Sequence, residues 1–111
     1  MSGVKEIEVQ IDAANKIRKL RDTCIRLINV PEYREIIEEG YFKQESTRLV
    51  MLKSSDLDKE SQMRLDGMIL GIGALHNFLG EIIRQGSVMD EAVAEDEKTR
   101  EELLGEEISN V

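Results

Sequence analysis

A long apolar stripe between residues 57 and 84 dominates the hydrophobic pattern of this chain. Its members recur at alternating spacings of three and four positions: Leu65, Met68, Ile72, Leu75, Leu79 and Ile82. This period is typical of an α-helix, here of about 28 residues and roughly 42 Å at 1.5 Å per residue. The mean spacing of 3.5 residues also suits pairing with another helix in a shallow left-handed supercoil.

Four glycines lie inside this predicted helix, and Gly67 and Gly71 stand four residues apart. A glycine in a helix interior costs about 0.8–1 kcal/mol relative to alanine. A second helix backbone that packs unusually close is the usual compensation. We therefore expect Gly67 and Gly71 to mark close helix packing, either against another helix of the same chain or across a homodimer. The uncharged run 67–75 is far shorter than the ~20 residues of a membrane span, so no membrane contact is expected.

A second long helix is predicted from about Val4 to Ile28. Its apolar residues share one side at helical spacing: Ile7, Ile11, Ala14, Ile17, Leu20, Cys24, Leu27 and Ile28. Two amphipathic helices of matched length favour an antiparallel pair. Cys24 lies on the apolar side, where a small core residue is a better interpretation than a nucleophile.

The segment between the long helices predicts two short ones. Pro31 disfavours helical geometry at Val30 and fits the first turn of a new helix. Gly40 is placed to end that helix as a C-terminal cap. A further helix is expected from Phe42 to about Lys53, before a loop. The predicted fold is therefore all-α, a helical bundle of two long antiparallel helices bridged by two short ones.

The C-terminal segment differs from the rest in charge. Residues 88–111 hold nine acidic and two basic residues, so they carry a net charge of −7 out of −8 for the whole chain. The sequence Gln85-Gly86-Ser87 predicts a helix end, which divides the chain into a bundle, 1–86, and an acidic, partly disordered tail, 87–111. Three apolar residues of the tail would align on one side of a short helix: Leu104, Ile108 and Val111. We expect them, together with Leu103, to bind a partner protein.

The first predicted helix has a basic side, formed by Lys16, Arg18, Lys19, Arg21 and Arg26. The simplest interpretation is a solvated face. A second is a docking surface for an acidic group, with the acidic tail as the nearest candidate, and nucleic acid is a third. Residues 1–87 are almost balanced in charge, which argues against sequence-independent DNA binding. Lys16, Lys19 and Arg26 are the candidate residues of this face.

The sequence contains no recognisable enzyme motif. There is one His and one Cys, neither with a second ligand at metal spacing, and the glycines do not form a phosphate-binding loop. We predict a protein without catalytic activity, metal or cofactor; an enzyme acting on small molecules is the least favoured alternative. No basic region followed by an apolar one begins the chain, so no signal peptide is expected.

One segment resembles a known class of proteins. Residues 29–50, Asn-Val-Pro-Glu-Tyr-Arg-Glu-Ile-Ile-Glu-Glu-Gly-Tyr-Phe-Lys-Gln-Glu-Ser-Thr-Arg-Leu-Val, are similar to a stretch in small helical accessory proteins of tailed bacteriophages. The resemblance implies a virion-associated or assembly protein, found in the host cytoplasm or in the virion, that binds a phage structural or host protein. The alternative is a regulator that inhibits a host nucleic-acid enzyme through its acidic tail.

Overall fold

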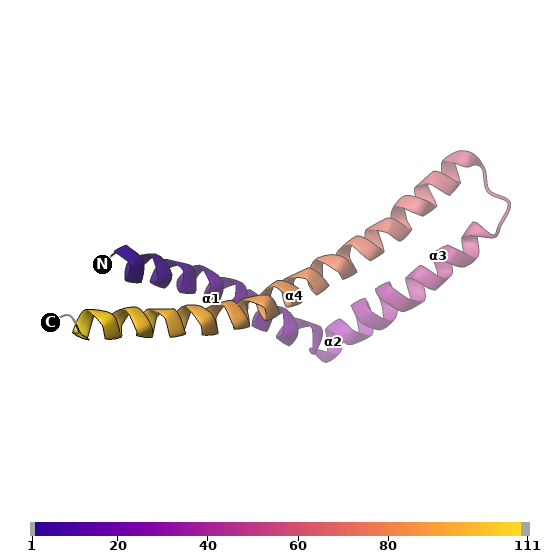
Figure 1. The fold of residues 1–111 in the computed structure, drawn as a ribbon. Coiled ribbons are helices and arrows are strands. Elements are labelled where there is room, and N and C mark those ends of the chain that lie inside the picture. The colour runs from indigo at the N-terminus through magenta and orange to yellow at the C-terminus, as the bar shows by residue number, and fades with distance from the viewer. Residues whose placement is uncertain (1, 110–111) are drawn as a thin grey trace. The chain divides into compact units, whose positions relative to one another are not determined.

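The computed structural model describes residues 2–109, with side chains from 3 to 108, and these residues form helices only. Helix α1 runs from Ser2 to Ile28 and helix α4 from Lys59 to Ser109. Three shorter pieces connect them: α2 (Pro31–Tyr33), the π-helix η1 (Arg34–Glu45) and α3 (Ser46–Lys53). Figure 1 shows the order of these helices along the chain. The all-α prediction is confirmed for the described residues.

The chain forms two compact units, and both α1 and α4 contribute residues to each of them. Unit 1 combines residues 1–24 with residues 82–111, and unit 2 is the intervening segment, residues 25–81. In unit 1, α1 and the last part of α4 lie side by side (Figure 1). Ile11 and Ala14 of α1 enclose Val93 of α4, which is only 2% exposed, and Ile7 and Met89 pack at the edge. The expected contact between the two long helices is therefore present.

Unit 2 has its own hydrophobic core. Leu49 of α3 is 1% exposed and packs with Leu65 and Ile72 of α4. Four half-buried residues surround this core: Tyr41, Phe42, Leu57 and Ile69. Since these residues come from η1, α3, the loop that precedes α4 and α4 itself, the core holds the bridging segment against the first part of α4.

The bridging segment is more regular than the sequence predicted. Val30 is extended, with φ −67° and ψ 131°, and Pro31 starts the new helix as expected. Gly40 does not end it, because helical structure continues through η1 into α3 without interruption. No described glycine has a positive φ, which is the geometry that a glycine cap requires. Gly40 lies inside the π-helix, where a Cβ atom would be 3.3 Å from the carbonyl oxygen of Glu35.

The start of α4 is fixed by a side-chain cap. The carboxylate of Asp58 accepts a hydrogen bond of 2.7 Å from the backbone N–H of Ser61. A hydrogen bond from the Ser61 side chain, together with this backbone bond, lowers the pKa of Asp58. The cap is therefore Asp58 itself, and the helix begins two residues later than Leu57. An ion pair between Lys53 and Asp66 joins α3 to α4 behind this cap.

The predicted helix end at Gln85-Gly86-Ser87 is wrong. Helix α4 continues through these residues to Ser109, a length of 51 residues. Ser87 does not cap a new helix, because its hydroxyl donates instead to the carbonyl oxygen of Ile83 at 3.1 Å. Gly86 is buried against α1, and the following turns supply Val93 to the core of unit 1. The first part of the acidic segment is thus helix that packs on α1.

Candidate partner-binding surfaces

The seven-residue repeat of α4 determines which of its side chains point inward. Buried or half-buried residues recur at Leu65, Ile72, Leu79, Gly86 and Val93. Each step of seven residues is close to two helical turns, so these residues share one side. The sequence stripe included three of them but ended before Gly86. This regular spacing across the Gly-Ser pair was the signal that could have revealed the continuous helix.

Among the described glycines, Gly86 lies closest to another helix. A Cβ atom built on Gly86 would lie 2.2 Å from Cβ and 2.4 Å from Cγ of Arg21. Close packing within the chain is therefore found at Gly86, a position that the sequence analysis did not select for it, whereas packing of Gly67 and Gly71 against a second copy stays a prediction. Within the described chain, a Cβ atom on either of those two glycines would meet nothing within 4 Å. Because a glycine destabilises a helix, each helix glycine suggests that close packing compensates for the loss. The sequence does not show which of the glycines has a neighbouring helix in the same chain.

An ion-pair cluster links α1 to α4 beside Gly86. Arg18 donates from Nε to Asp90 Oδ1 at 2.8 Å, and Arg21 donates from Nη1 to Asp90 Oδ2 at 2.8 Å. Arg21 also donates to Asp22. The hydrogen bond from Arg21, with help from Arg18, lowers the pKa of Asp90. The hydrogen bonds of Arg21 to Asp90 and to Asp22 raise the pKa of Arg21.

Lowering the pH should weaken unit 1 through Asp90. Because the folded pKa of Asp90 lies below its ordinary value of 3.8, the ion pair contributes fully at neutral pH. Its contribution should disappear as the pH falls below 3.8 and through the lowered pKa. In thermal unfolding, Asp90→Asn should be less stable than the wild type at pH 7, and the two should converge in acid. Glu101→Gln, an exposed position of the same helix, should follow the wild type throughout, and parallel curves for Asp90→Asn would contradict the linkage.

The rest of the predicted basic face remains at the surface. Lys16, Lys19 and Arg26 are exposed, whereas Arg18 and Arg21 are half-buried because they reach Asp90. Two members of the wider basic set therefore contact an acidic residue of the segment 88–111, and the three candidate residues face solvent.

The predicted partner-binding residues at the end of α4 do not share one environment. Leu103 points toward α1, where its Cδ1 atom would be 3.7 Å from a Cβ on Gly3. Leu104 is 39% exposed and Ile108 is 75% exposed, one turn apart on the same helix. Val111 lies outside the described residues. Leu104 and Ile108 thus form an exposed apolar pair, which we call the α4 end pair.

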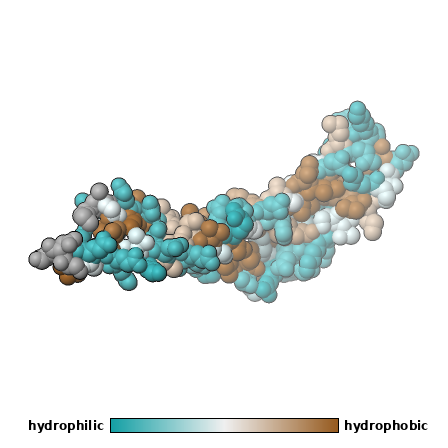
Figure 2. All heavy atoms as spheres, in the orientation of Figure 1, coloured by the Kyte–Doolittle hydropathy of each residue, from teal (hydrophilic) through white to brown (hydrophobic). Residues whose placement is uncertain are grey.

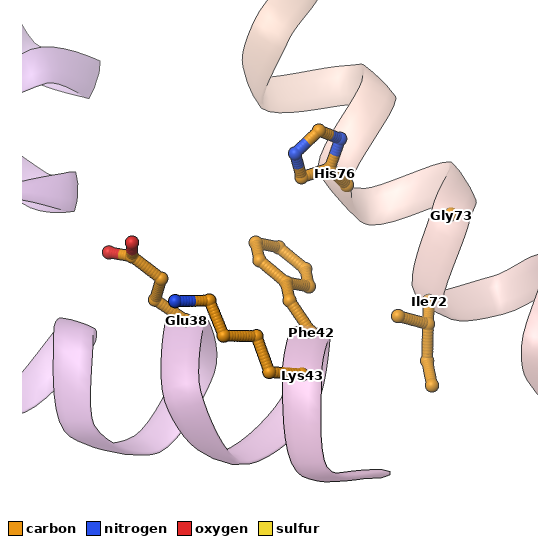
Figure 3. Close-up of a pocket in the computed structure, with 6 residues that line it drawn as sticks. All are labelled: Glu38, Phe42, Lys43, Ile72, Gly73 and His76. Atoms are coloured by element: carbon orange, nitrogen blue, oxygen red, sulfur yellow. The ribbon is translucent and has the colours of Figure 1, made fainter. Parts of the chain in front are cut away.

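Unit 2 contains a cavity of about 420 Å³ between η1 and α4. Figure 3 shows Phe42 pointing from η1 toward His76 of α4, with Ile72 on the same side. The rings of Phe42 and His76 meet edge to face, with centroids 5.2 Å apart and planes at 81°. Glu38, Lys43 and Gly73 complete the lining. An apolar group bound there would contact Phe42, Ile72 and His76.

The charges at the edge of this cavity belong to a local network. Lys43 donates to Glu39 at 2.8 Å, and this bond, together with the charges of Glu39 and Glu38, raises the pKa of Lys43. Glu38 and Lys43 are five residues apart, which is the spacing of the hydrogen bonds in a π-helix. Residues at this spacing are about one turn apart, so η1 places Glu38 and Lys43 on the same side as Phe42.

No helix in the described part of the chain has the length and apolar character of a membrane span. Among residues 2–109, no three His, Cys, Asp or Glu side chains are grouped as metal ligands would be. Cys24 is buried, as expected for a core residue.

Comparison with known proteins adds no relative. No protein family, no functionally described protein and no solved structure matches this chain. The function of the chain is therefore inferred from the geometry of its candidate surfaces.

Proposed function

We propose that this chain is a non-enzymatic protein-binding module that engages another protein through the end of α4. The observation that carries the proposal is the α4 end pair. Leu104 and Ile108 project apolar side chains from a helix whose opposite side, at Leu103, packs toward α1. Exposed residues at i and i+4 on one side of a helix are the pattern with which a helix docks into a hydrophobic groove.

The arrangement in unit 1 supports a rigid presentation of this pair. In our proposal α1 and the second half of α4 run antiparallel, and two contacts favour this order. Gly3 is close to Leu103, whereas Arg21, eighteen residues further along α1, is close to Gly86. A partner would therefore meet a helix end that α1 already orders, and it would not have to supply the free energy of ordering that segment.

The class of partner follows from the resemblance of residues 29–50 to small helical proteins of tailed bacteriophages. We propose a virion-associated or assembly protein whose partner is a phage structural protein or a host protein. Acidic residues flank the α4 end pair, and Glu101, Glu102 and Glu106 are exposed. A matching groove would be apolar with a basic rim.

The experiment is capture of partners by the full-length protein from infected cells, followed by mass spectrometry and affinity measurement. The double variant L104E/I108E should keep the wild-type helicity, since both side chains are exposed, but should lose the partner. Each anchor contributes about 1.5–2 kcal/mol when buried, so affinity should fall at least about tenfold per residue. V9E changes another exposed apolar residue of unit 1 and should bind normally; equal binding by L104E/I108E would contradict the proposal.

A second candidate function is inhibition of a nucleic-acid enzyme by the acidic residues of α4. The exposed carboxylates of Glu97, Glu101, Glu102 and Glu106 on this helix favour it. Salt distinguishes the two candidates. Binding that relies on mimicry of nucleic acid should weaken steeply from low to moderate salt, whereas binding through Leu104 and Ile108 should change little.

A further inference from the structure

The first part of α4 has no charged residue between Asp66 and Glu81. A helix that is apolar on every side is normally covered on every side. Unit 2 covers only one side, where Leu65 and Ile72 are buried against the bridging segment. The opposite side has no cover within unit 2.

This uncovered side is a continuous surface, which we call the outer face of α4. It consists of Met63, Gly67, Leu70, Gly71, Ala74 and Phe78, all of which are exposed and lie within about one third of the helix circumference at 100° per residue. Its large members are strongly exposed: Met63 66%, Leu70 72% and Phe78 62%. Figure 2 shows hydrophobic residues at the surface in this region of α4. Contiguous apolar patches of this kind mark interaction sites.

We propose that the outer face of α4 is covered by the same face of a second copy of this chain, with the two helices antiparallel about a two-fold axis. In such an interface residue i contacts residue j, and j contacts i. The outer face matches itself when read in reverse. A two-fold axis between Leu70 and Gly71 sets Leu70 opposite Gly71 and Gly67 opposite Ala74. It also sets Met63 opposite Phe78, a pair that gains from sulfur–aromatic contact.

The sizes of these side chains support a second copy as the occupant. Each pair near the axis contains at least one glycine, and a Cβ on Gly67 or Gly71 meets nothing within 4 Å in the chain itself. Close approach of two helix backbones needs small residues on both helices. A second copy brings them at the matching positions, and the helix cost of Gly67 and Gly71 is then compensated.

The centre of the outer face, from Gly67 to Phe78, is uncharged and is therefore compatible with its own copy. Charged residues lie at its two ends: Glu60, Arg64 and Asp66 near Met63, and Glu81 after Phe78. The proposed axis sets Glu60 opposite Glu81 at each end, where water and salt screen the repulsion between the two carboxylates. This is the usual division of an interface into an apolar centre and a polar rim.

The first test is the mass of the full-length protein by sedimentation equilibrium over a range of concentrations. The wild type should be a dimer at micromolar concentration, and L70E and F78E should each be monomers with unchanged helicity. V50E alters an apolar residue of α3 that is 55% exposed and should remain dimeric. A wild type that stays monomeric at high micromolar concentration, or an L70E variant that stays dimeric, would overturn the proposal.

The second test fixes the direction of the helices by oxidative cross-linking. In the antiparallel pairing the two copies of residue 70 lie next to the axis, so L70C should form an intermolecular disulfide. The two copies of residue 63 lie 15 residues apart along the helix, about 22 Å, which is far beyond disulfide reach. M63C should therefore not cross-link. Equal cross-linking of M63C and L70C would overturn the antiparallel arrangement.

This inference is independent of the proposed function, because it uses a different surface. L70E should still capture the partner bound through Leu104 and Ile108 if only the dimer fails. Conversely, L104E/I108E should remain dimeric whether or not it binds the partner, because neither substitution lies on the outer face of α4. The two sets of variants therefore separate failure of one proposal from failure of the other.

Discussion

Replacing Gly86 by leucine should strongly destabilise unit 1. The new Cβ would lie 2.2 Å from the Cβ of Arg21 and 3.2 Å from its Cδ. Arg21 has no easy way to move aside, because its guanidinium is bound to both Asp90 and Asp22. Overpacking usually destabilises the folded state by about 1–3 kcal/mol. Because the clash involves Cβ and Cγ of a side chain whose guanidinium is already bound, we expect a loss of stability at or above the upper end of this range. A fall in melting temperature of roughly 10–20 °C is expected in thermal unfolding followed by circular dichroism.

The matched control for this variant lies on the same helix of the same unit. A Cβ on Gly105 would meet nothing within 4 Å, so Gly105→Ala should remove only the helix cost of glycine. That change should stabilise α4 by about 0.4–1 kcal/mol. The two substitutions should therefore shift the melting temperature in opposite directions. A Gly86→Leu variant as stable as the wild type would show that α1 and α4 do not meet at Arg21.

Ending the chain after Gly86 should unfold α1 as well as remove the acidic segment. The truncation deletes Val93 and Met89, which cover Ile11 and Ala14, and it deletes the carboxylate that binds Arg18 and Arg21. A helix without a partner is marginal in water. The mean helicity of the residues that remain, 1–86, should therefore be lower than in the full-length protein. Circular dichroism at equal molar concentration measures this directly.

Ending the chain after Gly105 provides the comparison, because it keeps Leu103 and Val93. This shorter truncation should retain the helicity of the remaining residues and the melting temperature. If the chain ending at Gly86 also retained both, residues 87–109 would be an appendage, as the sequence alone predicted.

The sequence predicted the helical class correctly and the inner sides of the helices in part, since four members of the predicted stripes are exposed: Leu20, Leu27, Met68 and Leu75. Leu65, Ile72, Ile11, Ala14 and Cys24 were all placed on apolar stripes, and all are buried. The break at Pro31 was also predicted, because proline restricts the residue before it whatever the surroundings. These features depend on local geometry and periodicity, which a single sequence contains.

The errors have a common physical origin in glycine. Gly86 next to Ser87 is a local stop signal, but contact with Arg21 makes glycine necessary there for packing and the helix continues. Gly40 lies in a π-helix, which no local propensity separates from an α-helix. Gly67 and Gly71 were predicted to pack closely on a helix of the same chain or of a second copy, and the described chain places nothing within 4 Å of either. Sequence shows that a glycine is present, whereas its role depends on what lies opposite.

The candidate surfaces were predictable to a different degree. Leu104 and Ile108 were identified from their spacing, and both are exposed, whereas Leu103 packs toward α1. The ion pairs of Asp90 were not predicted, because nothing in the sequence distinguishes Asp90 from the other eight acidic residues of the segment 88–111. Its importance comes from the two arginines of α1, which lie 69 and 72 residues away in sequence.

That separation in sequence has a consequence for the order of folding. Unit 2 is contained, along the chain, within unit 1, whose two halves are the beginning and the end of the sequence. Joining Arg18 to Asp90 in an unfolded chain closes a very long loop, and the loss of chain entropy grows with loop length. Once residues 25–81 are folded, most of that entropy has already been lost. The contacts of Asp90 and Gly86 with α1 should therefore form last, since distant contacts are the slow ones to form.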